Sequence, residues 1–337
     1  MNVHDLPTPA LVVDAEALEH NLATMAAACP GARLRPHVKA HKCTQLAAVQ
    51  QAHGHRTFTC ATPREVIGMA RAGLGNDLLL ANETLDGTRL QAMAALTPDA
   101  LVTIAVDSEA TITAAAVAGI SHVLIDVNVG LPRCGCDPDD AGRLADLARA
   151  RGLTVRGVMG YEGHLMAVAD RDERAGKLVG CVERLLAAHA LVGGEIISTG
   201  GTGTFDLHDD RVTEIQAGSY ALMDTAYATT APVFRQALFV ETTVIASNPK
   251  GWAVCDAGLK SLGMDHGNPA IDGANVLFCS DEHVTFAMND GAPLPRPGER
   301  ATVIPAHVDP TMAMHEQIHL VHDEAVIESW PIDLRGW

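Results

Sequence analysis

The lysine-containing stretch Arg35–Lys42, RPHVKAHK, carries the first residues in the chain whose types could do chemistry. It ends an expected strand over residues 34–39. Side chains two apart in a strand share a face, so His37 and Lys39 are expected to point together into a barrel. A lysine buried at the carboxyl end of a barrel strand has a lowered pKa, and its neutral amine can form a Schiff base. A surface strand end with solvated cations explains this fragment equally well.

A glycine-rich stretch, Ser198–Thr204 (STGGTGT), directly follows another expected strand. Glycines lack a Cβ, so consecutive backbone N–H groups can close around an anion, and threonine hydroxyls add donors. In a barrel, the loops after the last strands commonly build a phosphate site. A flexible turn is the alternative interpretation.

A histidine and an aspartate alternate in the C-terminal stretch Pro305–Thr311, PAHVDPT. If this stretch is extended, His307 and Asp309 share a face and could bind one divalent ion. Two protein ligands leave positions open for water and substrate, as a catalytic metal site requires. An ordinary His–Asp hydrogen bond in a loop is the alternative.

Two shorter stretches also follow expected strands, where the active-site loops of a barrel lie. They are Leu131–Gly135 (LPRCG) and Tyr161–His164 (YEGH).

The elements that would position these residues alternate regularly from about residue 10 to 225. Ala/Leu-rich helical patterns separate β-rich runs at 10–14, 34–39, 56–60, 77–81, 101–106, 121–127, 154–159 and 195–199. Repeated βα units predict a parallel sheet with helices outside, and this many units favours a closed (β/α)8 barrel of the TIM type. A doubly wound open sheet is the competitor, but no G-x-G-x-x-G follows the first strand.

After about residue 230 the sequence pattern changes: apolar and polar residues alternate as in β-strands, and Gly, Pro, Asn and Asp interrupt the runs. We expect an α/β barrel domain over 15–230. A mostly antiparallel β domain over 231–337, together with 1–14, would carry the histidine–aspartate motif.

Composition and charge narrow the class of partner. A net charge of −17 argues against nucleic acid, which needs a basic face. No apolar run reaches membrane-spanning length, the N-terminus has no signal-peptide pattern, and the eight cysteines are scattered. These features predict no membrane partner and a cytoplasmic location with reduced thiols.

Taken together and in order, these stretches resemble the D-threonine aldolase / D-serine dehydratase family over nearly the whole chain. The segments that carry the resemblance are TPALVVD, RPHVKAHK, LLLANE, AVDS, RCG, GYEGHL, GGTGT, AGSYALMD, ALFVETTV, DAGLK, DEH and AHVDPT. The resemblance implies a fold type III enzyme that uses pyridoxal 5'-phosphate (PLP), with the alanine-racemase type of barrel plus β domain. Departures at Ala40 and at 128–132 concern the choice of substrate rather than the fold.

The resemblance also implies roles for residues around the cofactor. Lys39 would be the Schiff-base lysine. Gly201 and Thr202 would hold the phosphate, with Tyr220 as a helper. Arg133 would face the cofactor phenolate or the substrate carboxylate. The implied cofactor-binding residues are Lys39, His37, Arg133, Gly201, Thr202 and Tyr220.

On the substrate side, the resemblance implies that Tyr161 and His164 line the pocket and that His307 and Asp309 bind a divalent metal. The aldolase branch of the family reads His-x-Asp at this place, whereas the dehydratase branch typically reads His-x-Cys. An aspartate oxygen is a harder ligand than a thiolate, so Mn²⁺, Mg²⁺ or Co²⁺ suits the pair better than Zn²⁺.

The implied activity is that of a PLP- and divalent-metal-dependent lyase. It would cleave a D-β-hydroxy amino acid of the D-threonine or 3-hydroxy-D-aspartate type to glycine and an aldehyde, by retro-aldol reaction. The alternative is a D-serine or D-threo-3-hydroxyaspartate dehydratase that gives a 2-oxo acid and ammonia. An amino-acid racemase, a non-catalytic PLP-binding protein and a metal-only hydrolase are weaker alternatives. The resemblance further implies a homodimer.

Overall fold

The computed structural model describes residues 1–337, which divide into two compact units. The barrel unit comprises residues 25–39, 46–218 and 334–337, and the β unit comprises residues 1–24, 40–45 and 219–333. Each unit is therefore assembled from separate stretches of the chain.

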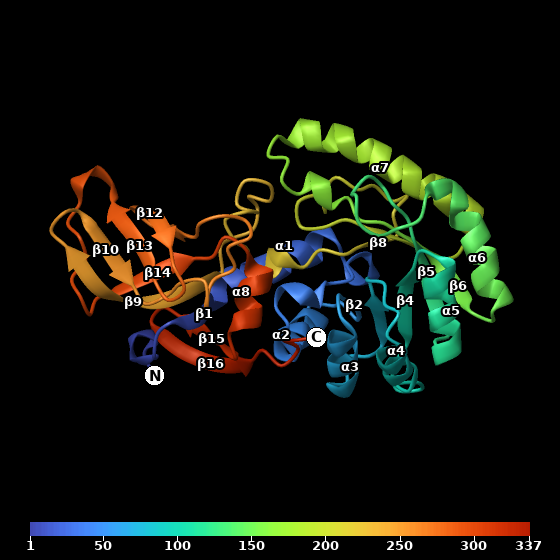
Figure 1. The fold of residues 1–337 in the computed structure, drawn as a ribbon, viewed down its shortest axis with the longest axis horizontal. Helices are drawn as coiled ribbons and strands as arrows, with labels where there is room; N and C mark the ends of the chain where they lie inside the picture. Colours follow the sequence, from blue (N-terminus) through green and yellow to red (C-terminus); the bar gives the residue numbers. More distant parts are fainter. The chain divides into compact units, whose positions relative to one another are not determined.

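The barrel unit is built on a parallel sheet of seven strands in the order β2-β3-β4-β5-β6-β7-β8 (Figure 1). The strands are β2 (Thr57–Cys60), β3 (Asp77–Leu80), β4 (Val102–Val106), β5 (His122–Asp126), β6 (Thr154–Met159), β7 (Ile196–Thr199) and β8 (Glu214–Ile215). From β3 to β8, each strand pairs in parallel with the strand before it along the chain. Their carboxyl ends therefore lie at one edge of the sheet.

Residues 34–37 close this sheet by bonding to both of its outer strands. Arg35 N–H donates to Ile215 O at 2.9 Å, on the β8 side, and Thr59 N–H of β2 donates to Pro36 O, also at 2.9 Å. The predicted (β/α)8 barrel of the alanine-racemase type is thus confirmed. The predicted strand over 34–39 is wrong at its end, because residues 38–40 form a short 3-10 helix, η3 (Val38–Ala40). Pro36 offers no N–H to continue a ladder, which limits the pairing here to isolated bridges.

Helices follow the strands, and their ends carry ordinary capping signals. They are α1 (Ala15–Ala28), α2 (Thr44–Ala52), α3 (Pro63–Arg71), α4 (Gly87–Ala94), α5 (Glu109–Ala118), α6 (Ala141–Ala150) and α7 (Arg171–Val192). The Thr62 side chain accepts the Glu65 N–H at the start of α3, where Pro63 begins the first turn. None of the helices combines the length and the apolar character needed to cross a membrane.

An apolar cluster runs across five neighbouring strands of the barrel unit. It contains one residue each from β3, β4, β5, β6 and β7: Leu79, Ala105, Leu124, Met159 and Ile196. Burial of these side chains fixes the strands side by side, and with them the loops at their carboxyl ends.

The β unit contains a nine-stranded sheet whose main path is β12-β13-β10-β9-β1-β15-β16, with β14 pairing β9 and β11 (Figure 1). The strands are β1 (Ala10–Asp14), β9 (Leu238–Asn248), β10 (Trp252–Cys255), β11 (Ala270–Ile271), β12 (Ala274–Cys279), β13 (Val284–Met288), β14 (Arg300–Ile304), β15 (Gln317–His322) and β16 (Ala325–Pro331). Among these pairs only β1 and β15 run parallel, so the sheet is mostly antiparallel, as predicted. One short helix, α8 (Val308–Met314), precedes β15.

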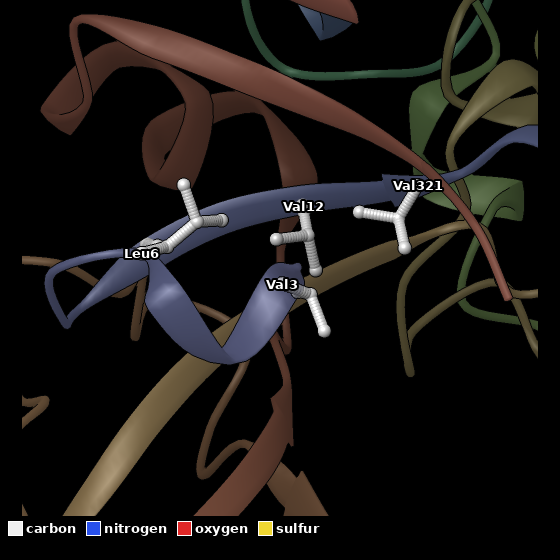
Figure 2. Close-up of a cluster of buried hydrophobic side chains, with 5 residues drawn as sticks. Val3, Leu6, Val12 and Val321 are labelled. Carbon is white, nitrogen blue, oxygen red and sulfur yellow. The ribbon is translucent and has the colours of Figure 1, made fainter. Parts of the chain in front are cut away.

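The N-terminal strand β1 lies inside this sheet, between β9 and β15. The turn before it, η1 (Val3–Asp5), folds back so that Val3 and Leu6 join Val12 of β1 and Val321 of β15 in a buried cluster (Figure 2). The first residues of the chain are thereby fixed to some of the last.

Candidate active site

Lys39 lies in η3, directly after the segment that closes the barrel, and its side chain is half-buried. Its N–H donates to His37 Nδ1 at 3.4 Å, and the His37 N–H donates to Ala217 O at 3.0 Å. The expectation that His37 and Lys39 share a strand face is wrong, because Lys39 lies in a helical turn. A Cβ at Gly218 would lie 2.5 Å from His37 O, so this turn packs directly on glycine backbone.

The glycine-rich stretch forms a tight turn after β7. Gly200 has a φ of +86°, which favours glycine. Gly201 N–H donates to Thr204 Oγ1 at 3.2 Å, and Thr204 N–H donates back to Gly201 O at 3.1 Å. Thr202 and Thr204 are buried. Glycine backbone beside buried threonine side chains is the composition of a turn that can hold a phosphate group.

Arg133, Tyr161 and Gly201 come together at this edge of the barrel unit. The Arg133 guanidinium carbon lies 5.4 Å from the centroid of the Tyr161 ring. A Cβ built on Gly201 would lie 3.4 Å from Cε2 of the same ring and 3.1 Å from Met166 Sδ. These three residues follow β5, β6 and β7, which are neighbours in the sheet. The Tyr161 ring therefore connects the loop after β5, which carries Arg133 (the arginine loop), to the glycine-rich turn.

His164 lies in η5 (Gly163–Leu165), and its side chain turns toward helix α7. Its Nε2 is 3.9 Å from Cys181 Sγ of α7, and a Cβ at Gly130 would be 3.1 Å from its Cε1. Burial raises the pKa of the Cys181 thiol to about 11, so this neighbour is neutral near pH 7. His164 thus contacts the outer helix and the loop after β5.

Glu162, between the two residues singled out in YEGH, was missed by sequence reasoning. It is fully buried and accepts hydrogen bonds from Thr199 Oγ1 and Thr204 Oγ1, both at 2.7 Å, and from His208 Nε2 at 3.0 Å. Burial alone would raise its pKa, but the hydrogen bonds from His208, Thr204 and Thr199 outweigh it and lower the pKa to about 2. The carboxylate is therefore ionised beneath the glycine-rich turn.

An acidic group was also missed, although its members follow β3 and β4 or end β5. The buried carboxyl of Asp126 has a pKa well above its usual range, first because of burial, and then because of the negative charge of Glu83 and a hydrogen bond with it. Ligand atoms of Glu83, Asp107 and Cys134 lie within 4.8 Å of one another. The Gly135 N–H donates to Asp107 Oδ2 at 3.2 Å, which ties the arginine loop to this group.

In the β unit, His307 and Asp309 come together at the start of α8. The prediction of an extended segment is wrong here, because His307 is the residue before the helix and Asp309 lies in its first turn, where Pro310 is also well tolerated. His307 Nε2 and Asp309 Oδ1 are nevertheless 3.9 Å apart. This is within the roughly 4.2 Å that two ligand bonds of about 2.1 Å can span around one ion.

Two neighbours of His307 were missed by sequence reasoning. Its Nδ1 donates to Asp265 Oδ2 at 2.7 Å, and its ring stacks on His266 with centroids 3.9 Å apart. A histidine that donates one ring N–H to a carboxylate is the usual arrangement of a metal-binding imidazole, because the other nitrogen is then held as the ligand. The donor set of one imidazole and one carboxylate therefore fits a divalent cation.

Tyr220 lies in η6 (Ser219–Ala221) of the β unit, where its ring is fully buried and packs on Phe234 with centroids 5.6 Å apart. Gly201 and Thr202 belong to the barrel unit.

Comparison with known proteins matches both parts of the chain. Residues 13–226 match the model of the alanine racemase N-terminal domain, and residues 237–321 match a model described as "Putative serine dehydratase domain". The D-threonine aldolase of Arthrobacter sp is 34% identical, over 98% of this chain and 93% of that protein. The D-threo-3-hydroxyaspartate dehydratase of Delftia sp. (strain HT23) is 29% identical over 98% of both chains.

A solved structure agrees with this placement. The crystal structure of D-threonine aldolase from Filomicrobium marinum superimposes with a TM-score of 0.94 at 35% identity, and covers 99% of this chain and 97% of that one. The chain therefore belongs to the D-threonine aldolase / D-serine dehydratase family, with its alanine-racemase-type barrel.

Proposed function

We propose that this protein is a PLP- and divalent-metal-dependent lyase that cleaves a D-β-hydroxy amino acid to glycine and an aldehyde. The substrate is of the D-threonine or 3-hydroxy-D-aspartate type. Besides family membership, the observation that carries the proposal is the His307–Asp309 pair, with His307 Nδ1 held by Asp265. Neither a racemase nor a PLP carrier has a use for such a pair.

Residues of the barrel unit would hold the cofactor. Lys39 would bind it covalently, the turn at Gly201 and Thr202 would hold its phosphate, and Arg133 would face its phenolate or the substrate carboxylate. When bound, PLP supplies an electron sink for the electron pair released at the substrate's Cα. We retain His37 beside Lys39 and Tyr220 as the remaining cofactor-binding residues.

Residues facing the substrate would control its orientation and its protons. Tyr161, stacked under Arg133, forms a wall of the pocket and helps to exclude water. Cleavage removes the β-hydroxyl proton as the aldehyde C=O forms and Cα–Cβ breaks, and Cα then takes up a proton to give glycine. His164 is the candidate for accepting the hydroxyl proton.

A divalent ion on His307 and Asp309 would lower the pKa of a hydroxyl group that it binds. We propose Mn²⁺, Mg²⁺ or Co²⁺ rather than Zn²⁺, because an aspartate oxygen is a hard ligand. We further propose a cytoplasmic homodimer with a PLP-binding barrel domain over 15–230 and a β domain over 231–337 with 1–14. The two family models match on either side of that boundary, which supports the division.

The second candidate is a dehydratase that gives a 2-oxo acid and ammonia. It is favoured by the similarity to the Delftia dehydratase along the whole chain. The two reactions would use the same residues but break different bonds, Cα–Cβ in one and Cα–H followed by Cβ–O in the other.

In the deciding experiment, PLP and Mn²⁺ are added to the purified protein. The protein is then incubated separately with each of three candidate substrates: D-threonine, D-threo-3-hydroxyaspartate and D-serine. Glycine plus aldehyde is the expected product, and it should disappear with EDTA and in Lys39→Ala. A 2-oxo acid without glycine would contradict the aldolase proposal and support the dehydratase.

A further inference from the structure

We infer that Glu162 is a positioning residue that sets the shape of the Thr199–Thr204 turn, so that this turn can hold a phosphate group. The inference rests on the proposed function insofar as the phosphate is that of PLP. Glu162 itself is buried beneath the turn and acts through the backbone and hydroxyl groups that it binds.

Both carboxylate oxygens of Glu162 are fully used. Oε2 accepts from Thr199 Oγ1 at 2.7 Å and from Gly200 N–H at 3.3 Å. Oε1 accepts from Thr204 Oγ1 at 2.7 Å and from His208 Nε2 at 3.0 Å. Three of the four donors belong to the turn itself, at its first, second and last residues.

The hydroxyl of Thr204 extends this control to Gly201. A hydroxyl has one proton, and Thr204 gives that proton to Glu162. Its oxygen must therefore accept the Gly201 N–H, which is 3.2 Å away. The N–H groups of Gly200 and Gly201 are thus both directed inward, one to Glu162 and one to the threonine that Glu162 orients. Neither N–H is then available to donate to a phosphate, so the donors to a phosphate must be other groups of the turn.

His208 gives the carboxylate its remaining partner. Its side chain is as fully buried as that of Glu162, and its Nδ1 makes no hydrogen bond in the structure. A buried carboxylate is stable only when its lone pairs are satisfied. Four donors in place of water achieve this, and they hold the turn in one shape before any ligand arrives.

The isosteric variant Glu162→Gln tests the role of the acceptor directly. An amide has one acceptor oxygen, and the Gly200 N–H can only donate, so the oxygen must stay on that side. The amide NH2 then faces Thr204 and His208, and the hydroxyl orientation that holds Gly201 is lost. Glu214→Gln is the matched control, because Glu214 is also a buried glutamate of the barrel unit but binds Arg35 Nε at 2.8 Å, outside the turn.

The measurement is the dissociation constant of the apo-protein for PLP and for pyridoxal, which lacks the phosphate, followed by absorbance. Loss of a hydrogen bond to a charged group predicts PLP binding weakened by roughly tenfold or more in Glu162→Gln. Pyridoxal binding should change by less than about twofold, and Glu214→Gln should match the wild type for both ligands. Equal weakening of PLP and pyridoxal, or unchanged PLP binding, would overturn the inference.

A second pair of variants keeps the test decisive if Glu162→Gln does not fold. Thr204→Ser retains the hydroxyl and should bind PLP like the wild type, whereas Thr204→Val should lose PLP affinity selectively. Identical behaviour of the two variants would contradict the inference. If the wild-type protein itself binds no PLP, the proposed function fails instead, and the two failures are thereby told apart.

Discussion

At the scale of single residues, the candidate site depends on carboxylates that hold other residues of the site in place. Asp265 holds the imidazole of His307, Glu162 holds the glycine-rich turn, and Asp107 accepts the Gly135 N–H beside Arg133. Each acts on a residue that the sequence pattern did identify. In a site of this kind a few side chains carry out the chemistry, and their hydrogen-bond partners fix the positions of those side chains.

The role of Asp265 leads to a prediction on metal affinity. Asp265→Asn removes the carboxylate that accepts the His307 Nδ1–H, so the ring orientation and its basicity are less well fixed. Mn²⁺ binding, measured by isothermal titration calorimetry, should weaken by about 10–100-fold. Asp272→Asn, an exposed aspartate of the same unit, is the control. Wild-type affinity in Asp265→Asn would show that the hydrogen bond is incidental.

The lowered pKa of Glu162 leads to a prediction on acid stability. Its pKa falls from the ordinary 4.5 to about 2 on folding, so the stabilising contribution is complete above pH 4.5 and is lost as pH falls toward 2. Glu162→Gln cannot make this contribution at any pH. The difference in unfolding free energy between wild type and Glu162→Gln should therefore shrink between pH 5 and pH 2, as measured by urea denaturation. A constant difference across that range would contradict an ionised carboxylate.

At the scale of elements, the barrel brings its loops together because β2 to β8 are parallel neighbours with residues 34–37 between the two outer strands. Lys39 follows this closing segment and lies in a helical turn that packs on Gly218. The position of the lysine is thus set by a contact between two loops rather than by strand alternation.

That contact is tested by Gly218→Ala. The added Cβ would lie 2.5 Å from the carbonyl oxygen of His37, and backbone cannot move aside as a flexible side chain can. We expect a loss of about 1–3 kcal/mol in stability, with weakened PLP binding, by thermal unfolding and absorbance. Gly176→Ala on α7, where a Cβ meets no atom within 4 Å, should instead stabilise by about 0.5–1 kcal/mol. Equal changes in stability in Gly218→Ala and Gly176→Ala would contradict the packing explanation.

The sequence predicted the fold well because the barrel strands are apolar runs at regular spacing, and buried runs of that kind are what a parallel sheet requires. It did not predict β8, because Glu214–Ile215 is too short to give a pattern. Extended segments were predicted at Lys39 and Asp309 because helices of three and seven residues are too short to give a periodic signal. Asp265 lies 42 residues before its partner His307, and Glu162 lies 37 to 46 residues before its own partners, so only the folded chain pairs them.

At the scale of the whole molecule, the β unit joins the beginning of the chain to its end. Val12 of β1 is paired with Phe239 of β9 on one side and with His319 of β15 on the other. Val12→Ala removes two buried methyl groups from the cluster in Figure 2 and should cost about 2 kcal/mol of stability. Denaturant unfolding monitored by circular dichroism measures this cost. Val117→Ala, at an exposed position on α5, should change stability by less than about 0.5 kcal/mol.

The central place of β1 has a consequence for how the protein is made. Strand β9 is synthesised about 220 residues after β1, which takes roughly 10–45 s at about 5–20 residues per second. During that interval this apolar strand has neither neighbour, while residues 46–218 of the barrel unit are being synthesised. The barrel can therefore fold during translation, whereas the β unit must fold after it, and a nascent chain stalled before residue 238 would present β1 to chaperones.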